Sequence, residues 1–235
     1  MMEYSIIEVM ERMIKNASVV DLSYTMEEKM PVWPTHARFG ATIYESYEYG
    51  DVALQSMVSF GEHCGTHIDA PRHFIPGACP VDLLPTSSVM GRGVKIEAGF
   101  VKPRGLLTLE SILNFEQENG EIKKGDIVMI HFGWDAKYRL QPDSHEFLSD
   151  WPGLSGEAAE YLAGKKVSAV GCDALSLDAF GAEASVCHNA LLGSGIPIIE
   201  NICNLSNISV FTYVIGLPIK LRNGSGSPIR LVALQ

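Results

Sequence analysis

The 235-residue sequence lacks the features that would place the protein in a membrane or on nucleic acid. No apolar run approaches the ~20 residues that a membrane span needs, and charged residues interrupt the beginning of the chain where a signal peptide would be apolar. The formal net charge is −10 and the isoelectric point is about 5.1, whereas phosphate binding requires clustered Lys and Arg. We therefore expect neither a membrane partner nor a nucleic-acid partner.

Cysteine and basic clusters are also scarce. The five cysteines are an odd number and form no CxxC pair, which indicates free thiols and a cytoplasmic protein. The small basic group of Lys220, Arg222 and Arg230 is interpreted as solvated surface or as part of a subunit interface.

The chain is long enough for a sizeable core, and 46% of its residues are hydrophobic. Periodicity predicts helices over residues 6–15, 108–118 and 155–162. Strands are predicted over residues 18–22, 41–47, 53–60, 93–98, 126–132, 167–172, 196–199, 210–217 and 229–233, the second and third as a hairpin. The irregular alternation of strands and helices favours a mixed α/β fold. The Gly/Ser-rich loop over 223–228 is too short to separate domains, so we expect one domain over residues 1–235.

The most informative segment runs from His63 to His73, with the sequence His-Cys-Gly-Thr-His-Ile-Asp-Ala-Pro-Arg-His. It holds three of the seven histidines, and Asp69 lies among them. Imidazole and carboxylate are the ligands that zinc and manganese take in catalytic sites. A purely structural origin for this spacing is the weaker interpretation, because such groups cluster at functional sites.

A second pair of candidate ligands follows downstream. His188 begins a predicted helical turn, and Glu200 ends the apolar strand that comes next. A helix start and a strand end can meet at one edge of a sheet, where sites often form. Each residue is a weak signal alone, although a buried carboxylate without a partner is costly and a nearby cation would offset that cost.

These segments resemble the cyclase family of metal-dependent hydrolases, which includes kynurenine formamidase and isatin hydrolase. The family signature HxGTHxDxPxH is intact at residues 63–73. Shorter pieces at residues 31–34, 133–134, 151–155, 171–173 and 188–200 extend the resemblance over nearly the whole chain. It implies a mixed α/β fold of the swivelling β/β/α type with a central mixed or barrel-like sheet, and a homodimer or homotetramer.

The resemblance also implies roles for individual residues. His63 and His67 would bind a first metal, Asp69 would bridge two metals or bind one, and His188 would hold a second. Glu200 would bridge both ions. His73 would be the general acid and base, and Trp33 would line the substrate pocket. The cofactor would be Zn²⁺ or Mn²⁺, with one or two ions per chain.

These residue types predict hydrolysis of a small-molecule carbonyl compound. A divalent ion lowers the pKa of bound water toward ~7, so that hydroxide attacks the carbonyl carbon at neutral pH. A histidine with an unperturbed pKa of about 6.5 is suited to move the proton. Together with this chemistry, the family resemblance implies hydrolysis of an aryl amide or cyclic amide, with a kynurenine formamidase-like reaction first. An isatin hydrolase-like lactam or lactone hydrolysis is the alternative.

For several residues the sequence permits two interpretations. Phe60, Phe132 and Trp134 would either join Trp33 in an aromatic wall or pack in the core.

Arg72 would either meet a substrate carboxylate or form a salt bridge. Asp173 would either orient a ligand histidine or cap a turn. The alternative from another functional class is a non-catalytic protein that binds metal and assembles into an oligomer. His73 argues against it, because this histidine is an additional base beyond the residues needed as metal ligands.

Overall fold

The computed structural model describes residues 5–235. The main-sheet strands are β1 (Val19–Asp21), β4 (His67–Asp69), β5 (Met90–Glu97), β7 (Ile127–His131), β9 (Ala169–Cys172), β10 (Ile198–Glu200), β11 (Phe211–Pro218) and β12 (Gly226–Leu234). Two small sheets pair β2 (Gly40–Glu45) with β3 (Gln55–Ser59) and β6 (Leu106–Leu107) with β8 (Gly153–Leu154). The α-helices are α1 (Ile6–Asn16), α2 (Leu109–Asn119), α3 (Gly156–Lys165) and α4 (Val186–Gly193). Short 3-10 helices are η1 (Tyr47–Tyr49), η2 (Pro71–His73), η3 (Val81–Leu83), η4 (Thr86–Val89), η5 (Trp134–Lys137) and η6 (Leu205–Asn207).

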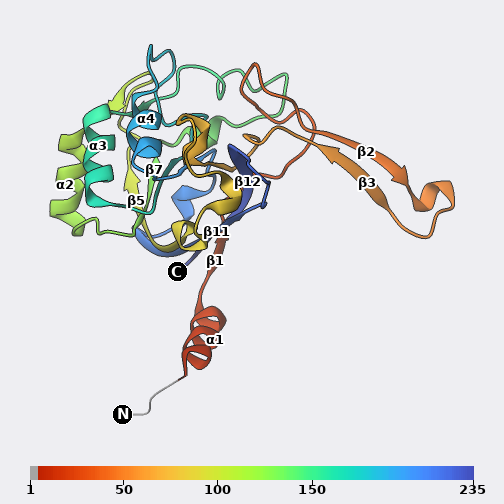
Figure 1. Ribbon diagram of the computed structural model, residues 1–235, viewed down its shortest axis with the longest axis horizontal. Coiled ribbons are helices and arrows are strands. Elements are labelled where there is room, and N and C mark those ends of the chain that lie inside the picture. Colours follow the sequence, from red (N-terminus) through yellow and green to blue (C-terminus); the bar gives the residue numbers. More distant parts are fainter. Residues whose placement is uncertain (1–4) are drawn as a thin grey trace.

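The main sheet closes on itself (Figure 1). Its order is β1-β12-β11-β5-β7-β9-β10-β4, and the start of β12 also pairs with β4. The strands β5, β7, β9 and β10 are parallel to their neighbours in that run, whereas the remaining pairings are antiparallel. This closed mixed sheet confirms the expected mixed α/β fold with a barrel-like core.

The strand β7 shows how the core is built on both sides of the sheet. Val128 and Ile130 pack with the helices α2, α3 and α4 in one apolar cluster. Ile127 and Met129, the residues alternating with them, belong to a second cluster inside the closed sheet. Successive side chains of a strand point to opposite faces, so a strand buried on both faces is apolar throughout.

The predicted helices are confirmed together with their start signals. Ser5 and Glu8 form a reciprocal capping box before α1. Thr108 caps α2 and Ser155 caps α3 through hydrogen bonds to backbone N–H groups. No helix in the part of the chain that the structure describes is long and apolar enough to cross a membrane.

Two strands begin three residues before their predicted starts because glycine weakens a strand signal. β5 begins at Met90 rather than at residue 93, and a Cβ at Gly93 would lie 2.4 Å from Val214 Cγ2. β12 begins at Gly226, within the segment expected to be a loop. A Cβ at Gly226 would lie 2.5 Å from His63 Cε1, so the closure of the sheet beside the histidine cluster requires a residue without a side chain.

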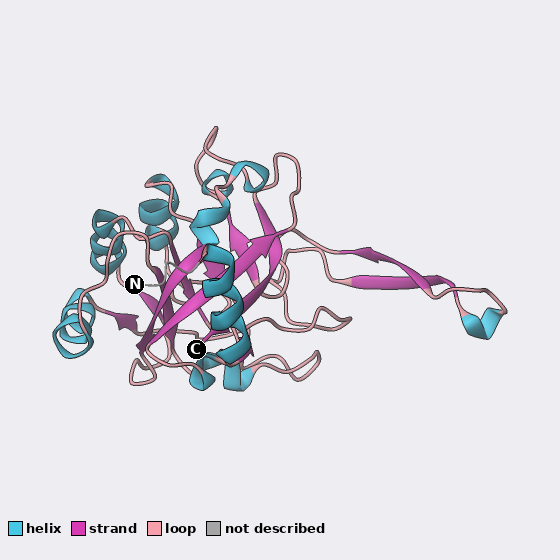
Figure 2. Cartoon of the chain, turned by 90° about the horizontal axis from the view of Figure 1, so that it is seen from below, coloured by secondary structure: helices cyan, strands magenta, loops and turns pink. Residues whose placement is uncertain are grey.

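The hairpin of β2 and β3 is confirmed, and it projects far from the body (Figures 1 and 2). The chain leaves the body after a loop of residues 24–39 that contains no helix or strand. It returns at Phe60, shortly before the histidine cluster. The base of the hairpin therefore adjoins the candidate site.

Candidate metal centre

The sheet brings the two halves of the candidate site together. β4 and β10 are antiparallel neighbours, with His67 opposite Glu200. His67 and Asp69 are two residues apart on β4, so their side chains share one face. The helix α4, which leads into β10, supplies His188. The predicted convergence of these four residues is therefore present in the structure.

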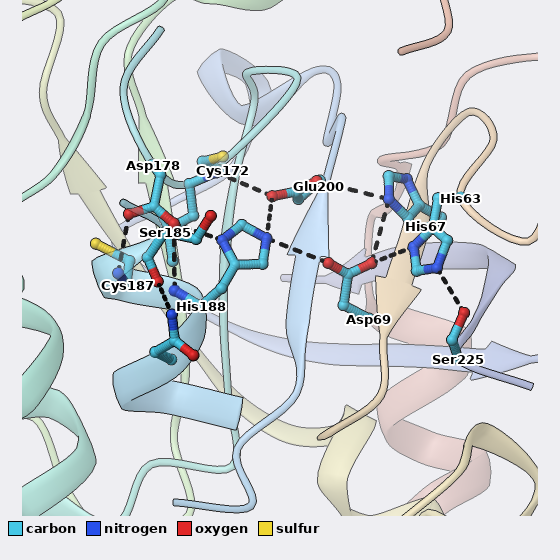
Figure 3. A network of polar contacts seen from close by, with 12 residues as sticks. His63, His67, Asp69, Cys172, Asp178, Ser185, Cys187, His188, Glu200 and Ser225 are labelled. Carbon is cyan, nitrogen blue, oxygen red and sulfur yellow. Dashed lines mark hydrogen bonds and ion pairs between the residues drawn. The ribbon is translucent and has the colours of Figure 1, made fainter. Parts of the chain in front are cut away.

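Four polar side chains point at one another across this edge (Figure 3). His67 Nε2 lies 3.4 Å from Asp69 Oδ1 and 3.6 Å from Glu200 Oε2. His188 Nε2 lies 3.4 Å from Asp69 Oδ2 and 3.3 Å from Glu200 Oε1. The two carboxylates thus stand between two imidazoles, with each carboxylate facing both rings.

These separations fit a bound divalent ion. Two ligand atoms ~2.1 Å from a tetrahedral ion lie roughly 3.4 Å apart, close to the four distances above. The donors are two imidazole nitrogens and two carboxylates, which suit zinc or manganese. Asp69 and Glu200 are only 1% and 5% exposed, and burying such charges is costly unless a cation neutralises them. Geometry, donor chemistry and burial all agree with a metal.

His63 and His73 lie on the other side of Asp69 and stack on each other. His63 Nδ1 is 2.6 Å from Asp69 Oδ1, and its Nε2 is 2.9 Å from Ser225 Oγ. The rings of His63 and His73 stack with centroids 3.9 Å apart. His63, Asp69 and His73 offer ligand atoms within 4.8 Å of one another. The structure therefore gathers all six predicted metal and acid-base residues, and their individual roles stay predictions.

Contacts of the Nδ1 atoms orient the rings of His67 and His188, whose Nε2 atoms face the two carboxylates. Nδ1 of His67 donates to the Gly65 carbonyl at 2.8 Å. Nδ1 of His188 contacts Asp178 Oδ2 at 2.6 Å, and Asp178 also accepts the backbone N–H groups of Cys187 and His188. Each contact leaves Nε2 free to face the centre. Asp178 was not predicted from the sequence, because it lies in an irregular segment ten residues before His188 with no periodic pattern to mark it.

Charge and burial shift the pKa values of this cluster in a consistent way. Burial alone would lower the pKa of His67, but the hydrogen bond with Asp69 and the charges of Asp69 and Glu200 raise it. Burial also opposes the shift at His188, whose pKa is raised by Asp178, Asp69 and Glu200. Burial would raise the pKa of Asp69, yet contacts with His188, His63 and His67 hold it well below its ordinary value. A metal must therefore compete with protons for the ring nitrogens of His67 and His188.

His73 differs from the ligand candidates. Burial lowers its pKa to about 4, with the nearby histidines acting in the same direction and the charge of Asp69 opposing them. Its imidazole is therefore neutral at pH 7 and able to accept a proton.

A cavity of about 290 Å³ opens onto the cluster. Besides the site residues, it is lined by Pro31, Val32, Trp33, His36, Gly65, Phe74, Leu175, Ser176, Ser185 and Asn201. Trp33, which is 40% exposed, forms part of its wall as predicted. Phe74 and His36 were not predicted to line the cavity. For Phe74 the sequence offered one indication, because this residue directly follows the signature of residues 63–73.

The other aromatic residues considered for the wall, Phe60, Phe132 and Trp134, do not line the cavity. Phe132 and Trp134 are buried in the core between the sheet and the helices, and Phe60 stacks on Phe39. Core packing, one of the two interpretations, is correct for Phe132 and Trp134, and Phe60 packs against a smaller apolar cluster.

The open question about Asp173 is resolved by its contacts. Asp173 accepts the backbone N–H groups of Phe132 and Trp134 at 2.8 and 2.7 Å and does not contact a ligand histidine. It fixes the turn after β7, as one of the two interpretations held. Arg72 is exposed. The position of Arg72 therefore does not support a contact between its guanidinium group and a substrate carboxylate in the cavity.

Comparisons with known proteins identify relatives along the whole chain. The profile of the family described as "Putative cyclase" matches residues 20–179. A kynurenine formamidase of Bacillus cereus is 27% identical over 221 residues, covering 93% of this chain and 98% of that protein. An isatin hydrolase of Roseibium aggregatum is 31% identical over 213 residues, covering 82% of this chain and 80% of that protein.

Solved structures agree with these relatives. An isatin hydrolase bound to the product analogue thioisatinate superposes with a TM-score of 0.91 at 25% identity, over 99% of both chains. Isatin hydrolase A from Ralstonia solanacearum gives a TM-score of 0.90 at 26% identity, covering 100% of this chain and 98% of that one.

Proposed function

The chain belongs to the Cyclase family, and we propose that it is a metal-dependent hydrolase acting on a C–N bond of a small aryl amide or cyclic amide. The observation that carries this proposal is the cluster of His67, Asp69, His188 and Glu200, in which each carboxylate faces both imidazoles. His63 and His73 lie on the other side of Asp69. The names of the relatives, kynurenine formamidase and isatin hydrolase, support an aryl formamide or a cyclic amide as the substrate.

The cluster residues take complementary parts in this reaction. His67, Asp69, His188 and Glu200 would hold the metal, and His63 would add a ligand on the far side of Asp69. When bound, the cation supplies a water molecule of lowered pKa and a positive charge beside the substrate carbonyl oxygen. We propose Zn²⁺ or Mn²⁺, with one or two ions per chain. His67, Asp69 and Glu200 offer ligand atoms close enough together for one ion, and His63 with Asp69 belongs to a second such group.

His73 moves the proton. Its neutral imidazole accepts the proton of the attacking water and then delivers it to the departing nitrogen, so that the amide is cleaved to a carboxylate and an amine. Stacking on His63 and burial hold the ring in place and keep it unprotonated at neutral pH.

The cavity wall supplies the preference for an aromatic substrate. Trp33 and Phe74 present ring surfaces beside the histidines, and aromatic rings pack favourably on flat aryl groups. Trp33 is braced by Trp151, with ring centroids 5.7 Å apart. A planar aryl amide can therefore lie against Trp33 with its carbonyl turned toward the metal ligands.

The test is hydrolysis of N-formylkynurenine and isatin by the metal-loaded protein, with the Trp33→Ala variant alongside. We expect turnover of N-formylkynurenine first and isatin second, and a higher KM in the variant. Absence of turnover on both compounds by protein with metal bound would overturn the substrate class.

We further propose a homodimer or homotetramer in the cytoplasm. Five free cysteines among the described residues support a reducing compartment. Burial raises the pKa of Cys64 to about 11, so this thiol beside His63 stays protonated.

A further inference from the structure

Asn201 connects the two halves of the candidate site, although no step of the proposed reaction uses it. It directly follows Glu200 at the end of β10, is only 3% exposed and lines the cavity together with Gly65. Its side-chain Nδ2 donates to the Gly65 carbonyl at 3.1 Å, and its own carbonyl accepts the hydroxyl of Thr66 at 2.6 Å. Two hydrogen bonds therefore join the end of β10 to the turn that precedes β4.

The Gly65 carbonyl has a second donor, and that donor belongs to a proposed metal ligand. Nδ1 of His67 lies 2.8 Å from the same oxygen. A carbonyl oxygen has two lone pairs, so it can accept both groups at once. The direction of this carbonyl therefore determines whether Nδ1 of His67 has an acceptor while Nε2 faces Asp69 and Glu200.

The local backbone constrains this carbonyl only weakly. Gly65 has a φ of +64°, in the left-handed region, and it has no Cβ to restrict rotation of the peptide group that follows it. The Asn201 amide supplies a constraint from outside the turn. Asn201 is itself held in place, because its backbone N–H donates to the Ala174 carbonyl at 3.1 Å and its carbonyl accepts the Thr66 hydroxyl.

Backbone conformation alone does not explain an asparagine at this position. Asn201 has a φ of 56°, a left-handed conformation that glycine adopts more readily. The asparagine also buries its Oδ1, which accepts no hydrogen bond from any protein group within residues 5–235. Glycine would take the same φ without burying this oxygen. The feature that only the asparagine provides is the Nδ2 donor to Gly65.

We propose that Asn201 is a positioning residue for metal binding, which holds the Gly65 carbonyl in the direction that orients His67. This inference rests on the proposed function, because it treats His67 as a metal ligand. The hydrogen bonds are measurable in the metal-free protein, so failure of the positioning role is distinguishable from failure of the proposed function.

The first test compares the zinc affinity of wild type and Asn201→Gly in a competition titration with a chelating dye. Glycine keeps the left-handed backbone, so we expect a folded variant whose zinc affinity is roughly 10–100-fold lower. Asn204→Gly is the matched control, because Asn204 has a φ of 59° and donates its Nδ2 to the carbonyl of Asp21 on β1 at 2.9 Å. Its affinity stays at the wild-type value. Wild-type affinity in Asn201→Gly, or an equal loss in both variants, overturns the proposal.

The second test follows proton exchange by NMR in metal-free protein labelled with an NMR-active nitrogen isotope. In the wild type we expect the Asn201 side-chain amide and the His67 Nδ1–H to exchange more slowly than the side-chain amide of exposed Asn223. In Asn201→Gly the His67 proton exchanges faster, while the backbone N–H groups of β4 and β10 keep their wild-type rates.

Rapid exchange of the Asn201 amide in the wild type contradicts the positioning role, and so does an unchanged His67 proton in the variant. Slow exchange of both groups in a wild type that binds no zinc would support the hydrogen-bond arrangement and overturn the proposed function.

Discussion

Asp178 Oδ2 lies 2.6 Å from Nδ1 of His188, and this contact determines which nitrogen of His188 faces the metal ligands. The same carboxylate accepts two backbone N–H groups at the start of α4. One buried side chain thus sets both the direction of the helix start and the orientation of the imidazole.

We predict that Asp178→Ala weakens metal binding by roughly 10–100-fold, because the imidazole loses its orienting partner. Asp178→Asn keeps an oxygen acceptor and restores part of the affinity. The measurement is a competition titration with a chelating dye, combined with a thermal melt to show that the variants fold. Equal affinity in Asp178→Ala and wild type would contradict the orienting role.

We predict that His73→Ala lowers kcat by roughly 10²–10⁴-fold, the usual contribution of a general acid or base. Metal content is expected to stay at the wild-type level because we propose His73 as the general acid and base rather than as a metal ligand. His145→Ala, at an exposed position, is the control with unchanged kcat. Loss of metal together with unfolding in His73→Ala would instead favour a structural site.

The pKa shifts predict how pH changes the stability of the metal-free protein. The raised pKa values of His67 and His188 contribute stability below about 6.5, which is lost as pH rises through the raised values. The lowered pKa of Asp69 contributes stability above about 3.8, which is lost as pH falls through the lowered value. The metal-free chain is therefore expected to be more stable at pH 6 than at pH 8.5.

Urea unfolding at the two pH values measures this difference. Metal-loaded protein serves as the control, because the bound cation neutralises Asp69 and Glu200 at the higher pH and removes the loss. A metal-free protein that is equally stable at both pH values would show that the cluster does not hold its protons as described.

Asp173 is expected to be important for stability rather than for metal binding. It accepts the backbone N–H groups of two buried residues, Phe132 and Trp134. Asp173→Ala leaves these donors without partners and should lower the free energy of unfolding by about 2–4 kcal/mol. Asp143→Ala at an exposed position is the control, expected to stay within about 0.5 kcal/mol of wild type. A similar, small effect of both substitutions in chemical denaturation would refute the structural role of Asp173.

The sequence predicted the elements whose signals are local. Caps such as Thr108 and Ser155 marked helix starts correctly, and the alternation over residues 41–60 predicted the hairpin. The His63–His73 spacing and the positions of His188 and Glu200 predicted which residues meet.

Features that depend on tertiary contacts were missed. The pairing of Gly226 with Asp69, which closes the sheet, was hidden because glycine, serine and proline indicate a loop. Asp178 and His36 lie in irregular segments of the chain. The path of such segments in space cannot be predicted from hydrophobic periodicity, so the approach of these two residues to the site was not expected. The core position of Trp134 follows from the turn that Asp173 fixes, so the local sequence could not distinguish it from a wall residue.

The most direct test of metal-dependent amide hydrolysis measures turnover and metal content in the same samples. Protein is stripped with a chelator, reloaded stepwise with Zn²⁺ or Mn²⁺, and assayed on N-formylkynurenine. The account predicts no turnover without metal and activity that rises in proportion to bound metal until the site at Asp69 and Glu200 is filled. Full activity of the stripped protein, or bound metal with no turnover of any amide or lactone tried, would contradict it.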